Sequence, residues 1–176
     1  MRYIILDIET QKGKDDVGGW FPELMKVAIA VTYDELNGYR VWKEEETLML
    51  LSELSGFDSI VGFNLLGFDY GVLQPYDKLG FLDKIRTKTV DLLAKFHAAA
   101  GFRIKLDDLA DINLGIRKSS NGLQSLIWWK EGKVQEIIDY CKKDVEVTLK
   151  LYLFIKQNSF VEYSSYGRIK RVNINL

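Results

Sequence analysis

The chain of 176 residues has a single cysteine and no long apolar run. Because Cys141 has no partner within the chain, no internal disulfide can form, and a reducing, cytoplasmic setting is the simplest expectation. A membrane-spanning helix needs about 20 predominantly apolar residues, and no segment approaches that length. A strand pattern begins at residue 2, so no signal peptide is expected. The sequence therefore predicts a cytoplasmic protein without membrane contact.

A strong net charge is also absent, since 24 Lys and Arg residues against 25 Asp and Glu residues give −1. Proteins that coat nucleic acid usually have a basic footprint, so any contact with nucleic acid is expected to be local. Bound cations would supply positive charge at such a contact. The length and an apolar fraction of 47% predict one domain over residues 1–176, with its core at 2–159 and a hairpin or tail at 160–176.

The hydrophobic patterns predict an α/β protein with a central mixed β-sheet flanked by helices. Strands are expected at residues 2–7, 27–33, 38–42, 59–61 and 87–90. Helices are expected at 44–54, 68–76, 92–100, 106–113, 123–129 and 134–155. Turns at Asn37-Gly38 and Tyr166-Gly167 predict two hairpins. Residues 11–26, which contain several glycines, are expected to form an irregular segment at the rim of the site.

Four carboxylates in three separated segments stand beside strongly apolar sequence. They are Asp7, Glu9, Asp69 and Asp144. A charge in such surroundings is costly unless something neutralises it. Several carboxylates together suit hard divalent cations, so the pattern predicts a site for two Mg²⁺ or Mn²⁺ ions and indicates a two-metal nuclease.

The spacing within the motifs predicts which side chains share a face. Asp7 and Glu9 are two residues apart on a strand, so they project from one side of it, near its carboxyl end. Tyr140 and Asp144 are four apart on a helix and also share a face. Asp69 follows a strand and a loop. Each motif alone is weak evidence, and capping or surface carboxylates are the alternative interpretation.

Together, the motifs resemble those of the DEDD superfamily of 3′–5′ exonucleases, which have an RNase H-like fold. Asp7-Ile8-Glu9-Thr10 is similar to the Asp-x-Glu motif of that family. Asn64-Leu65-Leu66-Gly67-Phe68-Asp69 is similar to its Asn-x-x-x-Phe-Asp motif. Tyr140-Cys141-Lys142-Lys143-Asp144 is similar to the Tyr-x-x-x-Asp motif of the tyrosine subclass. The resemblance spans residues 2 to about 155 and extends to the exonuclease domain of family B DNA polymerases and to stand-alone or helicase-linked relatives.

The histidine subclass of this family is excluded by the sequence. It has a histidine five residues before the last aspartate, and Asp139 occupies that position. The only histidine, His97, lies in a different predicted helix. The resemblance thus assigns the role of that histidine to Tyr140.

The resemblance implies a metal-dependent exonuclease that releases 5′-mononucleotides from a 3′ end, with DNA favoured over RNA. Asp7 would bridge two metal ions, Glu9 and Asp144 would complete one site, and Asp69 would help to hold the other. Tyr140 would orient the attacking water, because a phenol with a pKa of about 10 is a poor general base at neutral pH.

The resemblance also implies the partners of the site. The substrate would be the single-stranded 3′ end of a nucleic acid, and a helicase or polymerase is a candidate protein partner. The positions that match substrate contacts in the family are Thr10, Asn64 and Phe68.

Two other functions stay open. One is a structure-specific endonuclease on the same RNase H-like fold, against which the Tyr-x-x-x-Asp pattern argues. The other is a degenerate domain that binds nucleic acid or a partner without catalysis, against which the complete set of carboxylates argues. Cys141 is expected to point away from Tyr140 and Asp144 and to pack in the core. The basic run Arg168-Ile169-Lys170-Arg171 is expected either to reach nucleic acid or to form a solvated edge strand.

Overall fold

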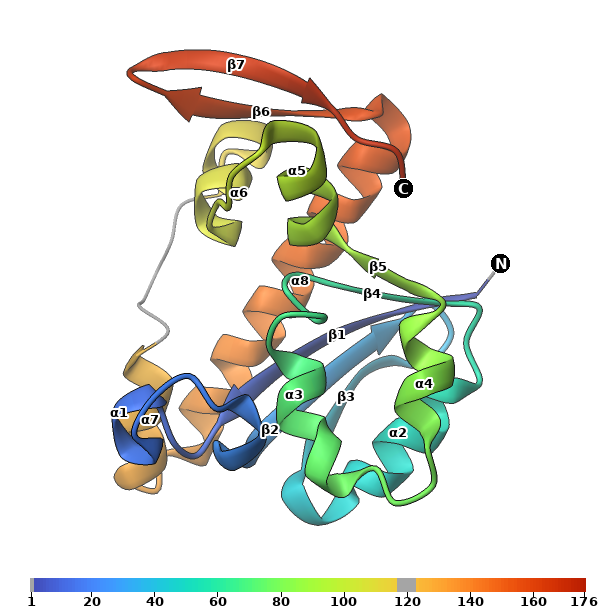
Figure 1. Cartoon of the computed structure of the whole chain (residues 1–176), viewed down its shortest axis with the longest axis vertical. Coiled ribbons are helices and arrows are strands. Elements are labelled where there is room, and N and C mark those ends of the chain that lie inside the picture. Colours follow the sequence, from blue (N-terminus) through green and yellow to red (C-terminus); the bar gives the residue numbers. More distant parts are fainter. Residues whose placement is uncertain (1, 117–122) are drawn as a thin grey trace.

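A five-stranded mixed sheet forms the centre of the protein in the computed structural model, which describes residues 2–116 and 123–176 (Figure 1). The strand order is β3-β2-β1-β4-β5. The strands are β1 (Tyr3–Thr10), β2 (Val27–Asp34), β3 (Gly38–Lys43), β4 (Ser59–Gly62) and β5 (Thr89–Asp91). β1 pairs antiparallel with β2 and parallel with β4, β2 pairs antiparallel with β3, and β4 pairs parallel with β5. The predicted fold class, an α/β protein with a mixed sheet, is confirmed.

Helices cover both faces of the sheet. α2, α3 and α4 lie along one side, and α8 runs along the other toward α5, α6 and the C-terminal hairpin (Figure 1). No helix among residues 2–116 and 123–176 is long and apolar enough to cross a membrane. The α-helices are α1 (Lys14–Val17), α2 (Thr47–Ser55), α3 (Asp69–Leu73), α4 (Phe81–Arg86), α5 (Leu92–Ala100), α6 (Leu106–Leu114), α7 (Leu123–Lys130) and α8 (Val134–Asn158). Short 3₁₀ turns are η1 (Pro22–Leu24), η2 (Glu44–Glu46) and η3 (Gln74–Tyr76).

The two faces of β1 belong to different apolar cores. Ile4, Leu6 and Ile8 pack into a core shared with α2, α3 and α4. Ile5 packs into the core on the α8 side. Side chains alternate along a strand, so Asp7 and Glu9 project on the same side as Ile5. The strand alternation therefore directs both acidic side chains toward α8.

The long helix α8 is fixed by an apolar stripe. Buried residues recur every three or four positions, which is the period of one helical face. They include Ile137, Cys141, Val145, Thr148, Tyr152 and Ile155. This stripe contacts β1, β2 and β4 and thereby sets the rotation of the helix about its axis.

The C-terminal residues form the predicted hairpin of β6 (Phe160–Ser165) and β7 (Arg168–Asn173). The hairpin is docked on the domain, because Val161 and Ile174 are buried in the α8-side core. Asn113 of α6 also exchanges two hydrogen bonds with the backbone of Glu162, each 2.8 Å long. The tail is therefore part of the packed structure on this side of the sheet.

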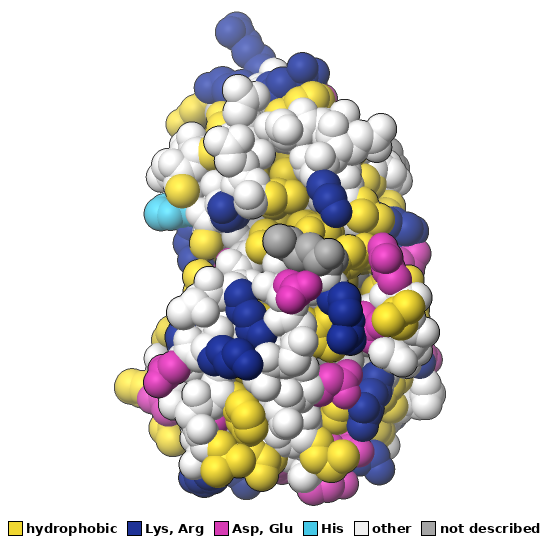
Figure 2. All heavy atoms as spheres, turned by 90° about the vertical axis from the view of Figure 1, so that its right-hand side faces the viewer, with side chains coloured by type: hydrophobic (Ala, Val, Ile, Leu, Met, Phe, Trp, Pro, Cys, Tyr) yellow, Lys and Arg dark blue, Asp and Glu magenta, His cyan; other side chains and the backbone are white. Residues whose placement is uncertain are grey.

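Charge is mixed over the surface. Acidic and basic side chains alternate on the face in Figure 2, and Lys and Arg gather at the hairpin end. Arg168, Lys170 and Arg171 of β7 are exposed. Arg171 is engaged within the hairpin, since it pairs with Glu162 at 2.8 Å and lies 3.8 Å from the Phe160 ring centroid. Of the two alternatives for the basic run, these contacts favour a solvated edge strand for Arg171. Arg168 and Lys170 lie on the same strand.

Several predicted boundaries differ from the structure. β1 continues to Thr10 instead of ending at Asp7, because Glu9 and Thr10 still pair with β2. The predicted helix at 44–54 starts with the 3₁₀ turn η2, and only Thr47–Ser55 is α-helical. Helix α4 was not predicted. Its first two free N–H groups, those of Phe81 and Leu82, donate to the Asp77 carboxylate, a cap that precedes the helix by several residues.

Asp91 ties the second motif to the sheet. As predicted, it caps α5, and its carboxylate accepts hydrogen bonds from the backbone N–H groups of Leu93 and Ala94. The same carboxylate accepts from the N–H groups of Asn64 and Leu66, both at 2.9 Å. Asp91 is 3% exposed. One buried carboxylate therefore holds both the start of α5 and the loop that leads to Asp69.

Asp91→Ala should destabilise the fold by roughly 3 kcal/mol, or about 10 °C in melting temperature, because a helix cap is lost and buried N–H groups lose their acceptor. Thermal denaturation followed by circular dichroism measures the change. Asp83→Ala, which removes an exposed carboxylate from α4, is the control and should change stability by less than about 0.5 kcal/mol. Equal stability of the two variants would show that the Asp91 hydrogen bonds do not hold this loop.

Candidate active site

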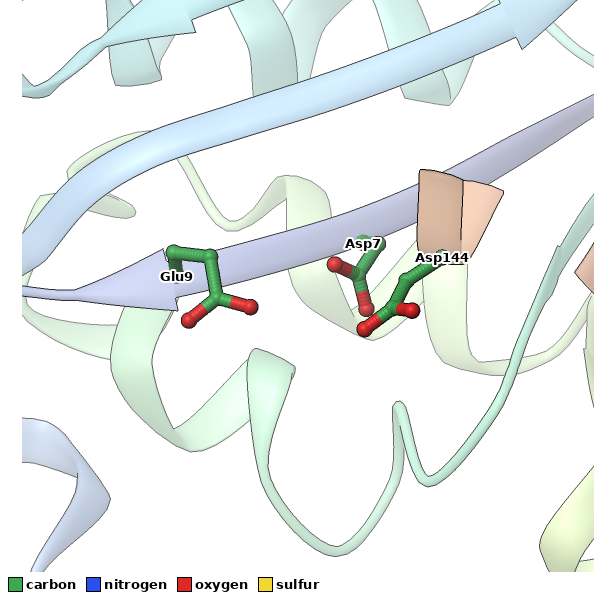
Figure 3. Close-up of side chains that lie close together, drawn as sticks. All are labelled: Asp7, Glu9 and Asp144. Atoms are coloured by element: carbon green, nitrogen blue, oxygen red, sulfur yellow. The ribbon is translucent and has the colours of Figure 1, made fainter. Parts of the chain in front are cut away.

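Three carboxylates converge between β1 and α8. One oxygen from each of Asp7, Glu9 and Asp144 lies within 4.8 Å of the other two. Figure 3 shows Asp7 and Glu9 projecting from the same strand and Asp144 reaching them from the helix. All three side chains are partly buried. Residues more than a hundred positions apart in the sequence thus present oxygen atoms to one small volume.

Asp69 lies beside this group without belonging to it. It is the first residue of α3, it is 3% exposed, and it lines the same cavity as the other three carboxylates. The backbone N–H groups of Asp69 itself and of Ile8 in β1 partly oppose the rise in the pKa of its carboxyl. Among the described residues, the set of mutually close ligand atoms contains Asp7, Glu9 and Asp144 but not Asp69. Asp69 therefore lies in the same cavity, at the edge of the cluster.

The environment disfavours negative charge on these groups. Burial raises the pKa of Asp7 to about 6, while the Cys141 thiol partly opposes the shift. Burial and the charge of Asp7 raise the pKa of Glu9 well above its usual range. The same two causes raise the pKa of Asp69. Among the described residues, no Lys or Arg is a cause that lowers the pKa of Asp7, Glu9 or Asp69, so the cluster fits a bound divalent cation with hard oxygen ligands.

The position of the Cys141 side chain differs from the one predicted from the sequence. It is fully buried, as expected, but it does not point away from the site. Its thiol lies 3.2 Å from Asp7 Oδ2 and 3.4 Å from the Asp7 carbonyl oxygen, and it donates to this residue. Position 141 is three residues before Asp144, so the helical spacing could have indicated that both side chains approach β1.

Ser125 is a site residue that the sequence interpretation did not identify. It lies in α7, is 1% exposed and lines the cavity. Its hydroxyl hydrogen-bonds the Glu9 carboxylate, which partly opposes the rise in the pKa of Glu9. No motif marks a single serine in a short helix, and only the packing of α7 against β1 reveals its role.

Tyr140 stands at the edge of the cluster, one helical turn before Asp144. It is half-buried, lines the cavity, and contacts the Trp128 ring with centroids 6.1 Å apart. Burial, followed by the negative charges of Asp144 and Glu9, raises the pKa of Tyr140 above its usual value. The phenol therefore stays neutral at physiological pH, so it can donate a hydrogen bond but cannot act as a general base.

The three predicted substrate contacts are distributed over two adjoining cavities. Thr10 and Phe68 line the carboxylate cavity, which has a volume of about 390 Å³. The Thr10 hydroxyl donates to the Lys12 carbonyl at 2.9 Å. Asn64 lines a neighbouring cavity of about 1010 Å³, and its Oδ1 accepts a hydrogen bond from Arg103 at 2.7 Å. Asp144 lines both cavities, so they meet at the cluster.

A family model described as the RNase H superfamily matches residues 4–155, and the chain belongs to that superfamily. Among solved structures, the fold is similar to that of the family B DNA polymerase from the hyperthermophilic archaeon Pyrobaculum calidifontis, with a TM-score of 0.66 and 18% sequence identity. The match covers 89% of this chain and 24% of the polymerase chain, so this chain spans about a quarter of that protein's length. No curated protein matches the chain significantly. The expected RNase H-like fold is confirmed.

Asp7→Asn should stabilise the metal-free protein above about pH 6. A carboxyl with a raised pKa is protonated more readily in the folded state, so the folded protein loses stability as pH rises from about 4, the unfolded pKa, to about 6. Asparagine lacks this charge. The free energy of unfolding of the variant should exceed that of the wild type by up to roughly 3 kcal/mol at about pH 8 in EDTA. The difference should shrink toward about pH 5.

Urea denaturation at a series of pH values measures the difference. Asp15→Asn makes the same chemical change at an exposed position of α1, and its stability should follow the wild type at every pH. A difference between Asp7→Asn and the wild type that stays constant with pH would contradict the prediction.

Cys141→Ala should weaken Mn²⁺ binding by about tenfold, because the hydrogen bond that orients the carboxylate of Asp7, a predicted metal ligand, is lost. Cys141→Ser keeps a donor at this position and should retain most of the affinity. Calorimetric Mn²⁺ titration measures the affinities, and melting temperatures in EDTA separate this effect from a general loss of packing. Equal Mn²⁺ affinity in the alanine variant and the wild type would show that the thiol has no role in Mn²⁺ binding.

Proposed function

We propose that the protein is a metal-dependent 3′–5′ exonuclease of the tyrosine subclass of the DEDD superfamily. The observation that carries the proposal is the convergence of Asp7, Glu9 and Asp144, with Tyr140 one helical turn from Asp144. Membership of the RNase H superfamily supports a nuclease-type activity. The three motifs supply the finer assignment, since each functional side chain reaches the same cavity.

The carboxylates have distinct roles in this proposal. Asp7, whose carboxylate lies close to those of Glu9 and Asp144, would hold divalent cations, Mg²⁺ or Mn²⁺. Glu9 and Asp144 would hold a cation together with Asp7, and Asp69 would assist from the edge of the cavity. When bound, these ions supply charge neutralisation at the phosphate and a water molecule of lowered pKa. Ser125 and Cys141 hold the Glu9 and Asp7 carboxylates in place.

Tyr140 positions the attacking water in this proposal. Its neutral phenol donates a hydrogen bond and thereby fixes the water on the line of attack. Its contact with the Trp128 ring limits the movement of the phenol. Thr10 and Phe68 shape the cavity around the scissile nucleotide, and Asn64, held by Arg103, contacts the strand where the two cavities meet.

The wall of the cavity supports the recognition of a strand end. The segment that contains α1 packs against α7, where Gly13 is so close to Leu126 that a Cβ on it would lie 2.7 Å from Leu126 Cδ1. Asp16 and Lys130 link the same two segments at 3.0 Å. A strand that passed the cluster on this side would meet this wall. We therefore favour a terminal nucleotide in the cavity, with a single-stranded 3′ end as the substrate and DNA preferred on the resemblance.

Asp7→Asn should abolish cleavage, with a loss of roughly a thousandfold or more, because several kcal/mol of charge stabilisation depend on this ligand. Tyr140→Phe should reduce the rate less, since the metal ligands remain. The assay follows 5′-labelled single-stranded and duplex DNA and RNA with Mn²⁺ or EDTA and resolves the product ladder. A shortening ladder with 5′-mononucleotide products is expected with Mn²⁺ alone, and a 3′-phosphate should block it.

Two control variants match these changes. Asp139→Asn alters a carboxylate on α8 that faces solvent, and Tyr166→Phe alters a fully exposed phenol at the hairpin turn. Both should cleave at the wild-type rate. Efficient cutting of a circular single strand would establish an endonuclease instead. Strand binding without any cleavage would establish the degenerate binding domain.

A further inference from the structure

Trp20 is an exposed aromatic residue at the rim of the carboxylate cavity. Its side chain is 61% exposed, although tryptophan ordinarily buries most of its large surface. It lies between α1 and η1, in the segment that follows the first motif. Trp20 also lines the cavity that contains the four carboxylates. Neither a motif nor the fold core accounts for a tryptophan at this position.

The Trp20 ring is placed against a second aromatic ring of the same cavity. Its centroid lies 5.5 Å from that of Phe68, with 37° between the ring planes. Phe68 immediately precedes Asp69 and also lines the cavity. The two rings therefore present aromatic surface beside the carboxylates, where a nucleotide held by its phosphate would place its base.

The backbone around Trp20 is structured. Gly18 closes α1 with a φ of 79°, and Gly19 has a φ of 153°, both in the region that favours glycine. The Gly19 N–H donates to the Lys14 carbonyl at 2.8 Å, and the Phe21 N–H donates to the Gly19 carbonyl at 3.1 Å. These hydrogen bonds on both sides of Trp20 fix its position on the rim, so its exposure is a feature of the folded structure.

The neighbouring side chains distinguish a nucleobase from a protein surface as the ligand. Phe21 and Leu24 are exposed close by in the sequence, but neither lines the carboxylate cavity. Trp20 shares the cavity with Phe68 and with Lys14, a cation suited to a phosphate. Aromatic surface, a lysine and carboxylates that would hold divalent cations beside a phosphate together match a nucleotide.

We propose that Trp20, together with Phe68, forms a platform on which the base of the nucleotide at the 3′ end stacks. The proposal rests on the proposed function and adds to it a binding residue outside the three motifs. Every base has an aromatic face, so such a platform accepts all four bases and gives affinity without sequence preference. This contact would supply strand affinity that a chain with a net charge of −1 does not obtain from a basic surface.

The test measures the coupling between Trp20 and a base. Strands labelled at the 5′ end, with an abasic nucleotide at each of the last positions in turn, are bound to the wild type, Trp20→Ala and Trp20→Phe. Binding is measured with Ca²⁺, in conditions where the strand is verified to stay intact. The wild type should lose about tenfold in affinity when the stacked base is removed, and Trp20→Ala should lose about tenfold on the intact strand but little on the abasic one. Trp20→Phe should retain most of the affinity.

Two further measurements separate the platform from the chemistry. Calorimetric titration with Mn²⁺ alone should give Trp20→Ala the affinity of the wild type, because the ring contacts the base and not the ions, and Tyr166→Ala should bind every strand like the wild type. If Trp20→Ala lost the same affinity for intact and abasic strands, or lost none, the stacking platform would be rejected. This holds even if the protein has exonuclease activity. Base-dependent binding through Trp20 without cleavage would support the platform and reject the exonuclease.

Discussion

The structure depends on keeping several carboxylates together in a partly buried space. Asp7, Glu9 and Asp144 bring oxygen atoms within 4.8 Å of one another, and Asp69 lines the same cavity. Burial and mutual repulsion raise the pKa of Glu9 and Asp69 well above their usual range. Without a cation, these groups oppose folding, so the rest of the domain must hold them in place against that cost. A divalent cation bound between them would relieve this repulsion, so the same groups would favour binding of the cation.

Three of the four carboxylates lie on β1 and α8, two elements with extensive contacts in the fold. β1 is the central strand, paired with β2 on one edge and β4 on the other, and α8 is fixed by an apolar stripe that contacts three strands. Donors from other elements then act on individual carboxylates. Cys141 donates to Asp7, Ser125 to Glu9, and the backbone of β1 to Asp69. Each donor favours the charged form, which is the form that binds metal.

The sequence predicted the parts of the site that follow from local periodicity. Strand alternation placed Asp7 and Glu9 on one face, and helical spacing placed Tyr140 beside Asp144, as the structure has them. The roles of Ser125 and Trp20 were not predictable in this way, because both arise from contacts between segments distant in the chain. The sheet order is likewise a tertiary property, although the mixed sheet itself followed from the order of strands and helices. Asp91 was recognised as a cap, but its bonds to the second motif depend on how β4 and β5 align.

The balance of charge and aromatic surface explains how such a site can recognise a polyanion. With a net charge of −1 and mixed charges over the face in Figure 2, long-range attraction of a nucleic acid is weak. In the proposed function, affinity comes from groups within the cavity itself: cations that the carboxylates would hold, and the Trp20 and Phe68 rings at its rim. The proposed stacking contact requires a nucleotide whose base is unpaired and free to enter. A frayed or single-stranded end meets that requirement, whereas a base in a paired duplex must first be unstacked. The near-zero net charge of the domain and the proposed stacking of the terminal base thus both favour recognition by groups within the cavity.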